Sequence, residues 1–136
     1  MGCRIVKKTK SYQLSRVGRL FRVKAAVGGL SETVARPLLL VDTGASFTIL
    51  PAEVISGLGY DLQFAQEKVR LVGINGITVA PVVNLTWFSC LGQIIKDFPV
   101  LVHTIPTGIY ADGLLGMDFL TQCKAVISVA EAKIRF

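Results

Sequence analysis

The sequence is poor in the side chains that bind metal ions. Its 136 residues include three cysteines, Cys3, Cys90 and Cys123, and one histidine, His103. A structural zinc site takes four Cys or His ligands at characteristic spacings, and these scattered residues have no such spacing. We therefore expect no metal ion, and nothing in the sequence points to another cofactor.

Long apolar runs are also missing. No stretch reaches the ~18 consecutive apolar residues of a membrane-spanning helix, and the basic start is not followed by the apolar segment of a secretory signal. We therefore expect a cytoplasmic protein with no membrane span. Apolar residues nevertheless make up 51% of the chain. For one small domain, this excess predicts surface buried against another molecule, and self-association is the simplest explanation.

Acidic residues are absent from the first 24 positions, which hold eight of the 15 lysines and arginines. The basic character of the chain therefore belongs to its N-terminal segment. Such a segment could attract nucleic acid or anionic lipid, or it could be a solvated arm with an edge strand protected by Lys and Arg. We favour the solvated arm and expect no nucleic-acid partner. We divide the chain into a basic segment, 1–18, and a single domain, 19–136.

Glycine-rich turn signals recur at short intervals between β-rich runs. Many short strands with frequent turns predict an all-β barrel or sandwich. The expected elements are strands over 19–27 and 35–42, one long strand or a strand pair over 93–103, hairpins over 67–88 and 124–136, and short helices over 51–59 and 117–123.

Asp42 stands out because it interrupts the apolar stretch "RPLLLVDTGASFTIL" (36–50). A buried carboxylate must be paired, hydrogen-bonded or neutralised, and the nearest basic residues are Arg36 and Lys68. The Asp-Thr-Gly sequence suits a tight loop, since Gly44 lets the backbone pass close to a neighbour. An ordinary Asx turn at a strand end is the alternative for these three residues alone.

The wider pattern is more specific. "LLLVDTGASFTIL" is followed by the glycine-containing "LVGINGITV" (71–79) and then by "DGLLGMDFL" (112–120). In order and spacing these three stretches resemble the retropepsin-like aspartic proteases, which comprise the retroviral proteases and their cellular relatives. The resemblance covers about residues 19–136. It implies a closed all-β fold equivalent to half of a pepsin-type enzyme.

The resemblance also implies an activity. Pepsin-type enzymes carry two Asp-Thr-Gly loops in one chain, whereas this chain has one, at 42–44. A second copy would supply the other carboxylate, so we expect a homodimeric aspartic endopeptidase with Asp42 as its catalytic residue and a peptide or protein as its substrate. Two carboxylates at ~3 Å share one proton, and together they activate a water and protonate the scissile carbonyl.

Further roles follow from the resemblance residue by residue. Thr43, Gly44 and Ala45 would complete the active-site loop. Since Ala45 lacks the hydroxyl that favours ionisation in many pepsin-type enzymes, we expect a milder acid optimum than theirs. Ser46 and Met117 stand where viral enzymes carry an ion pair, so this loop must be held in another way. Residues 71–78 would form a flap over the substrate. The expected substrate-binding residues are Ser46, Leu71, Val72, Gly73, Ile74, Asn75, Gly76, Asp112 and Leu114.

Two alternatives remain open at this point. The chain could be a retropepsin-like binding or dimerisation module with little or no proteolytic activity, because a fold does not fix a function. It could also act on nucleic acid through residues 1–24, which we favour least.

Overall fold

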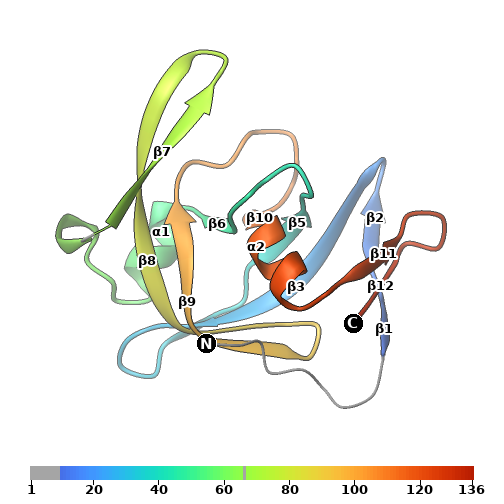
Figure 1. The fold of residues 1–136 in the computed structure, drawn as a ribbon. Coiled ribbons are helices and arrows are strands. Elements are labelled where there is room, and N and C mark those ends of the chain that lie inside the picture. The colour runs from blue at the N-terminus through green and yellow to red at the C-terminus, as the bar shows by residue number, and fades with distance from the viewer. Residues whose placement is uncertain (1–9, 66) are drawn as a thin grey trace.

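The structure is a computed structural model that describes residues 10–65 and 67–136 (Figure 1). Arg4, Lys7 and Lys8 of the expected basic segment lie outside the described residues. The elements, in chain order, are β1 (Ser11–Gln13), β2 (Ser15–Val17), β3 (Leu20–Gly28), β4 (Val34–Ala35), β5 (Leu38–Val41), β6 (Ile49–Leu50), α1 (Ala52–Gly57), the 3-10 helix η1 (Leu62–Phe64), β7 (Glu67–Gly73), β8 (Gly76–Cys90), β9 (Gln93–Val102), β10 (Gly113–Leu115), α2 (Met117–Gln122), β11 (Val126–Ser128) and β12 (Lys133–Arg135).

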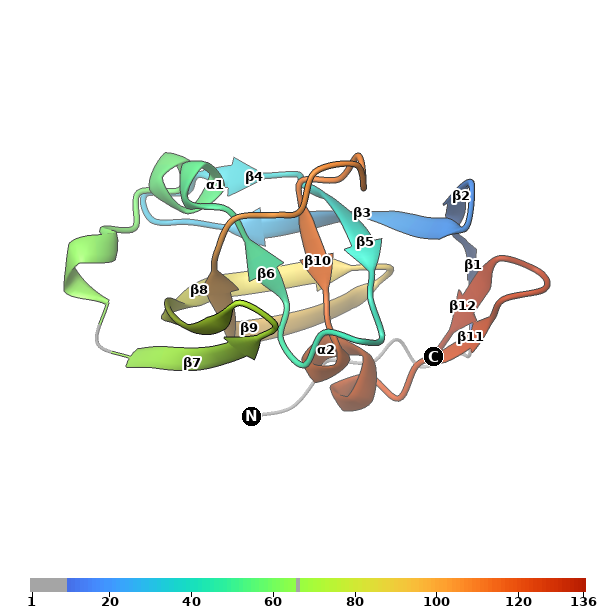
Figure 2. The same ribbon diagram turned by 90° about the horizontal axis from the view of Figure 1, so that it is seen from above.

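The larger sheet carries the Asp-Thr-Gly loop. Its strands follow the order β2-β3-β5-β10-β6-β9-β8-β7, with β4 beside β3 and a further pairing between β3 and β8. The pairing of β3 with β8 brings the sheet back on itself, which gives the fold its barrel-like form (Figure 2). At its centre, β10 pairs in parallel with β5 and antiparallel with β6. The strand ends before and after Asp42 are therefore joined through β10.

Two hairpins account for most of the sheet. In one, β8 and β9 pair from Val82↔Leu101 to Cys90↔Gln93, and the two turn residues, Leu91 and Gly92, have φ of 52° and 77°. Positive φ at both positions is the hallmark of a type I′ turn, whose twist matches that of the strands. The other hairpin, β7–β8, stands away from the rest of the molecule at the upper left of Figure 1.

The smaller sheet holds both ends of the fold. Its order is β1-β12-β11, with β12 antiparallel to each neighbour. Leu14, between β1 and β2, is 2% exposed and belongs to the hydrophobic core. The N-terminal strand β1 thus pairs with the C-terminal strand β12 of the same chain. The division at residue 18 remains a prediction.

The core anchors α2 through aromatic packing. Phe88 lies 4.8 Å from Phe98 and 5.4 Å from Phe119 between ring centroids. Phe119 is fully buried and Leu120 nearly so. Burying such side chains stabilises a fold by ~1.5–3 kcal/mol each, so the short α2 has a fixed position despite its six residues. That position matters because α2 lies beside the Asp-Thr-Gly loop.

No helix within the described ranges is both long and apolar enough to cross a membrane.

Candidate active site

Asp42 directly follows β5, at the centre of the larger sheet. Its backbone N–H donates to the carbonyl of Leu115 on β10 at 3.0 Å, which extends the parallel pairing of the two strands by one residue. The residue is half-buried, whereas Thr43 and Gly44 after it are exposed. The sheet thus fixes the backbone of the aspartate and leaves the loop open on its outer side.

The loop itself orients the carboxylate. The Gly44 N–H donates to Asp42 Oδ1 at 2.9 Å, and the Ala45 N–H donates to the Asp42 carbonyl at 3.1 Å. A Cβ atom at position 44 would lie 3.2 Å from Asp42 Oδ1, closer than most Cβ contacts. Glycine at this position therefore gives the carboxylate room. The same contacts make an Asx turn, so the local geometry fits both readings of these three residues.

The first turn of α2 holds the next two residues of the loop. The Met117 N–H donates to the Ala45 carbonyl at 2.8 Å, and the Asp118 N–H donates to the Ser46 carbonyl at 3.2 Å. By the resemblance to the viral enzymes, Ser46 and Met117 are expected at the positions of an ion pair. Backbone hydrogen bonds between the same two segments connect loop and helix here.

The expected flap is the β7–β8 hairpin. Gly73 pairs with Gly76, so Ile74 and Asn75 form the turn, and Gly76 follows with φ of +118°. The exposed fraction is 82% at Val72 and 105% at Ile74. Apolar side chains at the tip of a projecting hairpin indicate a surface that becomes covered by another molecule.

One cleft joins the loop to this hairpin. It has a volume of about 360 Å³, and its lining includes Gly44, Ala45 and Ser46 on one side and Leu71 and Val72 on the other. The cleft thus brings together residues from two of the three stretches that carry the resemblance. Its remaining lining residues, which the sequence analysis does not single out, are Phe47, Ile49, Arg70 and Leu101.

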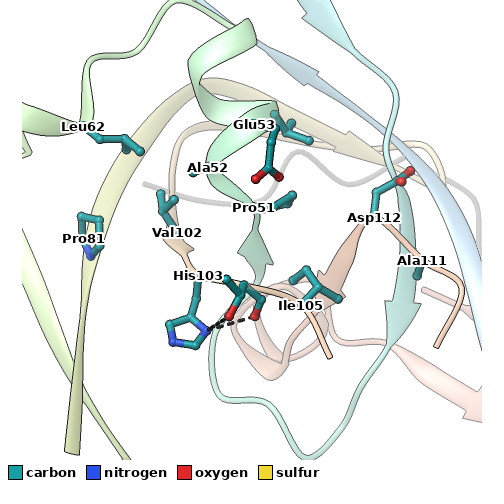
Figure 3. A pocket seen from close by; sticks show the side chains of 12 residues that line it. Pro51, Ala52, Glu53, Leu62, Pro81, Val102, His103, Ile105, Ala111 and Asp112 are labelled. Atoms are coloured by element: carbon teal, nitrogen blue, oxygen red, sulfur yellow. Dashed lines mark hydrogen bonds between the residues drawn. The ribbon is translucent and has the colours of Figure 1, made fainter. Parts of the chain in front are cut away.

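Asp112 and Leu114 do not line this cleft. Asp112 lies at a separate cavity of about 790 Å³ between α1, β9 and the segment before β10, where Glu53 directs its carboxylate inwards (Figure 3). Asp112 Oδ2 accepts a hydrogen bond from the Leu38 N–H at 2.8 Å, and the Asp112 N–H donates to the Leu38 carbonyl at 2.7 Å. Asp112 therefore fastens the start of β10 to β5. Leu114 is 8% exposed within β10.

Thr43 faces away from the cleft. It lines a hollow of about 380 Å³ whose other residues come from α2, the segment that follows it and β11, among them Met117, Leu120 and Ile127. Met117 is 38% exposed. We call this region, comprising Thr43, Met117, Leu120, Thr121, Lys124, Ala125 and Ile127, the α2 face.

Two polar residues beside the loop escaped the sequence analysis. They are Thr48, which is fully buried, and Asp118. Burial raises the pKa of Asp118 and hydrogen bonds from Thr48 and Phe119 lower it, but the effect of burial is larger, so the pKa lies above its ordinary value. Asp118 interrupts "LLGMDFL" and Thr48 interrupts "SFTIL", but neither polar residue belongs to a recognisable pattern such as Asp-Thr-Gly.

Other chemistries find less support among the described residues. Burial raises the pKa of the Cys90 thiol to about 12, so this cysteine is neutral and a poor nucleophile. Within residues 10–65 and 67–136, no three His, Cys, Asp or Glu side chains gather in a way that could hold a metal ion.

Comparison with known proteins supplies the family context. A family model described as "Aspartyl protease" matches residues 23–119. Among solved structures, a retropepsin-like aspartic protease from Rickettsia conorii matches with a TM-score of 0.71 and 23% sequence identity, over 95% of this chain and 92% of that one. No curated protein matches the chain significantly. At this identity the structural match shows the fold, and the all-β retropepsin-like prediction is confirmed.

Proposed function

Because this chain belongs to the aspartyl protease family, we propose that it is an aspartic endopeptidase that works as a homodimer with Asp42 as its catalytic residue. The observation that carries the proposal is the placement of Asp42, at the end of a central strand and oriented by the Gly44 N–H, beside a cleft roofed by a projecting hairpin. The family alone would not single out this carboxylate.

The proposed reaction needs two copies of Asp42. When two carboxylates lie ~3 Å apart, they hold one proton between them. The ionised carboxylate takes a proton from a bound water, which attacks the scissile carbonyl, while the protonated carboxyl donates to the carbonyl oxygen. The tetrahedral intermediate then collapses, and the leaving amine takes up a proton as the C–N bond breaks. Neither a metal ion nor a covalent enzyme intermediate takes part.

The α2 face supports a second copy as the source of the other carboxylate. It adjoins the Asp42 loop through Thr43, and it leaves the apolar side chain of Met117 partly exposed. A two-fold axis through this face would bring two Asp42 loops together, with the Thr43 side chains meeting at the axis. Burial of the face would also explain the high apolar content of the chain.

The cleft supports an extended peptide as the substrate. It runs between the loop residues 44–47 and the flap residues 70–72, so a peptide strand would lie between floor and flap. Leu71, Val72 and Ile74 would contact it from above, and closure of the flap would exclude water from the site. Gly73 and Gly76 allow the tip to change conformation during closure.

Peptide-library cleavage by the wild type and Asp42→Asn across about pH 3–7 tests the proposal. We expect cleavage by the wild type, with an optimum at mildly acidic pH, inhibition by a pepstatin-like compound, and a loss of at least ~10³-fold in Asp42→Asn. Asp97→Asn makes the same chemical change at an exposed aspartate on β9 and should cleave like the wild type. Equal cleavage by wild type and Asp42→Asn would refute the assignment. A folded wild type that cleaves nothing would favour a binding or dimerisation module.

A further inference from the structure

A buried polar connection joins the Asp42 loop to α2, apart from the backbone hydrogen bonds already described. Its members are Thr48, which ends the loop and precedes β6, and Asp118, in the first turn of α2. Thr48 is 0% exposed and its apolar neighbours along the chain are Phe47 and Ile49. Buried polar side chains cost free energy unless they are hydrogen-bonded, so their contacts define what they hold.

Both carboxylate oxygens of Asp118 bind Thr48. Asp118 Oδ2 accepts from the Thr48 N–H at 2.9 Å, and Oδ1 accepts from the Thr48 hydroxyl at 2.8 Å. Oδ1 also accepts from the Phe119 N–H at 2.8 Å. The Thr48 hydroxyl oxygen in turn accepts from the Gly116 N–H at 3.1 Å. The hydroxyl therefore links the backbone before α2 to the carboxylate on it.

The two segments approach too closely for any side chain between them. A Cβ atom at position 116 would lie 2.4 Å from the carbonyl carbon of Phe47 and 2.9 Å from the Thr48 nitrogen. Both atoms belong to the backbone, which cannot move aside as a flexible side chain could. The contacts of Thr48 and Asp118 thus fix the C-terminal end of the loop at a defined separation from α2.

We propose that Asp118 is a positioning residue whose carboxylate fixes the Asp42 loop through Thr48. This contact would hold the loop in place of an ion pair, which the uncharged Ser46 and Met117 cannot form. The proposal rests on the proposed function for its catalytic consequence. Together with the Asp118 N–H, which donates to Ser46, the carboxylate holds the loop at two residues. Asp42 enters the loop from β5, so the strand fixes one end and Asp118 fixes the other.

The chemistry of the contacts requires a carboxylate. Three donors converge on the two oxygens: the Thr48 N–H, the Thr48 hydroxyl and the Phe119 N–H. A carboxylate has two acceptor oxygens and no donor, whereas an asparagine amide offers one acceptor and turns an NH₂ group towards at least one of these donors. Asp118→Asn is nearly isosteric, so it removes the hydrogen-bond match and little of the packing.

The kinetic test compares the wild type with Asp118→Asn. We expect kcat to fall about 10–100-fold with little change in KM, because a displaced loop misaligns the carboxylates without altering most substrate contacts. Asp97→Asn is the matched control and should change neither constant. A change in KM with unchanged kcat would overturn the proposal. Unchanged kcat and KM in a folded Asp118→Asn would overturn it too.

A second pair of variants tests the Thr48 hydroxyl. Thr48→Val keeps the shape of the side chain and removes the hydroxyl, while Thr48→Ser keeps it. We expect kcat to fall in Thr48→Val and to be largely retained in Thr48→Ser. Equal rates in the two variants would overturn the role of the hydroxyl, and this pair remains decisive if Asp118→Asn does not fold.

Amide hydrogen exchange separates failure of this inference from failure of the proposed function. In Asp118→Asn we expect exchange at Thr48 and Met117 to speed up at least about tenfold over the wild type, with unchanged protection in β8 and β9. This readout needs no activity. Faster local exchange in a chain that cleaves nothing would keep the loop-fixing role and reject the protease. Unchanged exchange at both amides would reject the loop-fixing role even in an active enzyme.

Discussion

Asp42 and Asp118 are both aspartates within apolar stretches, but only Asp42 was identifiable from the sequence. The Asp-Thr-Gly pattern explains why Asp42 interrupts a strand, whereas Asp118 falls in the first turn of a short helix, where an acidic residue is common. Its significance depends on Thr48, which is 70 residues away in the chain. A contact of that kind leaves no local signal, so a single sequence does not reveal it.

The raised pKa of Asp118 predicts a specific dependence of stability on pH. Burial raises this pKa, so between its ordinary value and the raised value the folded chain binds more protons here than the unfolded chain. The contribution of Asp118 to the free energy of unfolding is therefore largest at low pH and falls as pH rises through this window. Asp118→Asn lacks this titration. Urea unfolding of both proteins from about pH 3 to about pH 7 should show the wild type losing stability relative to the variant. A constant difference across that range would contradict the prediction.

Arg70 predicts a substrate preference. Of the described residues that line the cleft between loop and flap, it is the one that carries a charge. We therefore expect peptides with an acidic side chain near the scissile bond to be cleaved about two- to tenfold better than matched basic peptides. Exposed charge pairs contribute ~0.2–1 kcal/mol, and a pair covered by the flap contributes somewhat more.

Charge reversal tests this preference directly. Arg70→Glu should invert the ranking of the acidic and basic peptides in kcat/KM. Lys68→Glu makes a similar reversal two residues earlier on β7, outside the cleft lining, and should leave the ranking unchanged. The same inversion in both variants would mean that the net charge of the hairpin, rather than Arg70, governs selection.

The secondary structure was predictable where the elements are long. The expected strands over 19–27 and 93–103 appear as β3 and β9, the hairpin over 67–88 appears as β7 and β8, and both short helices appear within their expected ranges. The sequence analysis missed β6 and β10, which have two and three residues. Segments that short show no period of alternation. They are strands because each pairs with a partner distant in sequence, and β10 forms the link between the two ends of the Asp42 loop.

The turn from β10 into α2 depends on Gly116. Gly116→Ala would push a Cβ into the Phe47 backbone, and we expect it to lower the free energy of unfolding by about 1–3 kcal/mol and to reduce activity through the loop. Gly57→Ala, at the end of α1, is the contrasting variant, because nothing lies within 4 Å of its added Cβ. It should raise the free energy of unfolding by about 0.4–1 kcal/mol. Urea unfolding measures both, and similar effects of the two substitutions would contradict the predicted crowding at Gly116.

For the molecule as a whole, the α2 face predicts how copies associate. Met117→Glu places a charge on this face and should shift the protein from dimer to monomer in sedimentation experiments, with a parallel loss of peptide cleavage. Ile94→Glu is the matched control, because Ile94 is 39% exposed, close to the 38% of Met117, but lies on β9 away from α2. A wild type that is monomeric at all concentrations yet fully active would contradict the shared site.

The three-stranded sheet predicts what would happen if the two subunits of the proposed dimer separated. Since β12 already has a neighbour from its own chain on each side, a departing subunit would keep the strands of this sheet and would expose the α2 face. Dilution should therefore yield folded but inactive monomers that regain cleavage activity when the protein is concentrated again. Where monomers predominate, the cleavage rate should rise with the second power of the amount of protein, so that a cell could set the activity of this chain through its abundance alone.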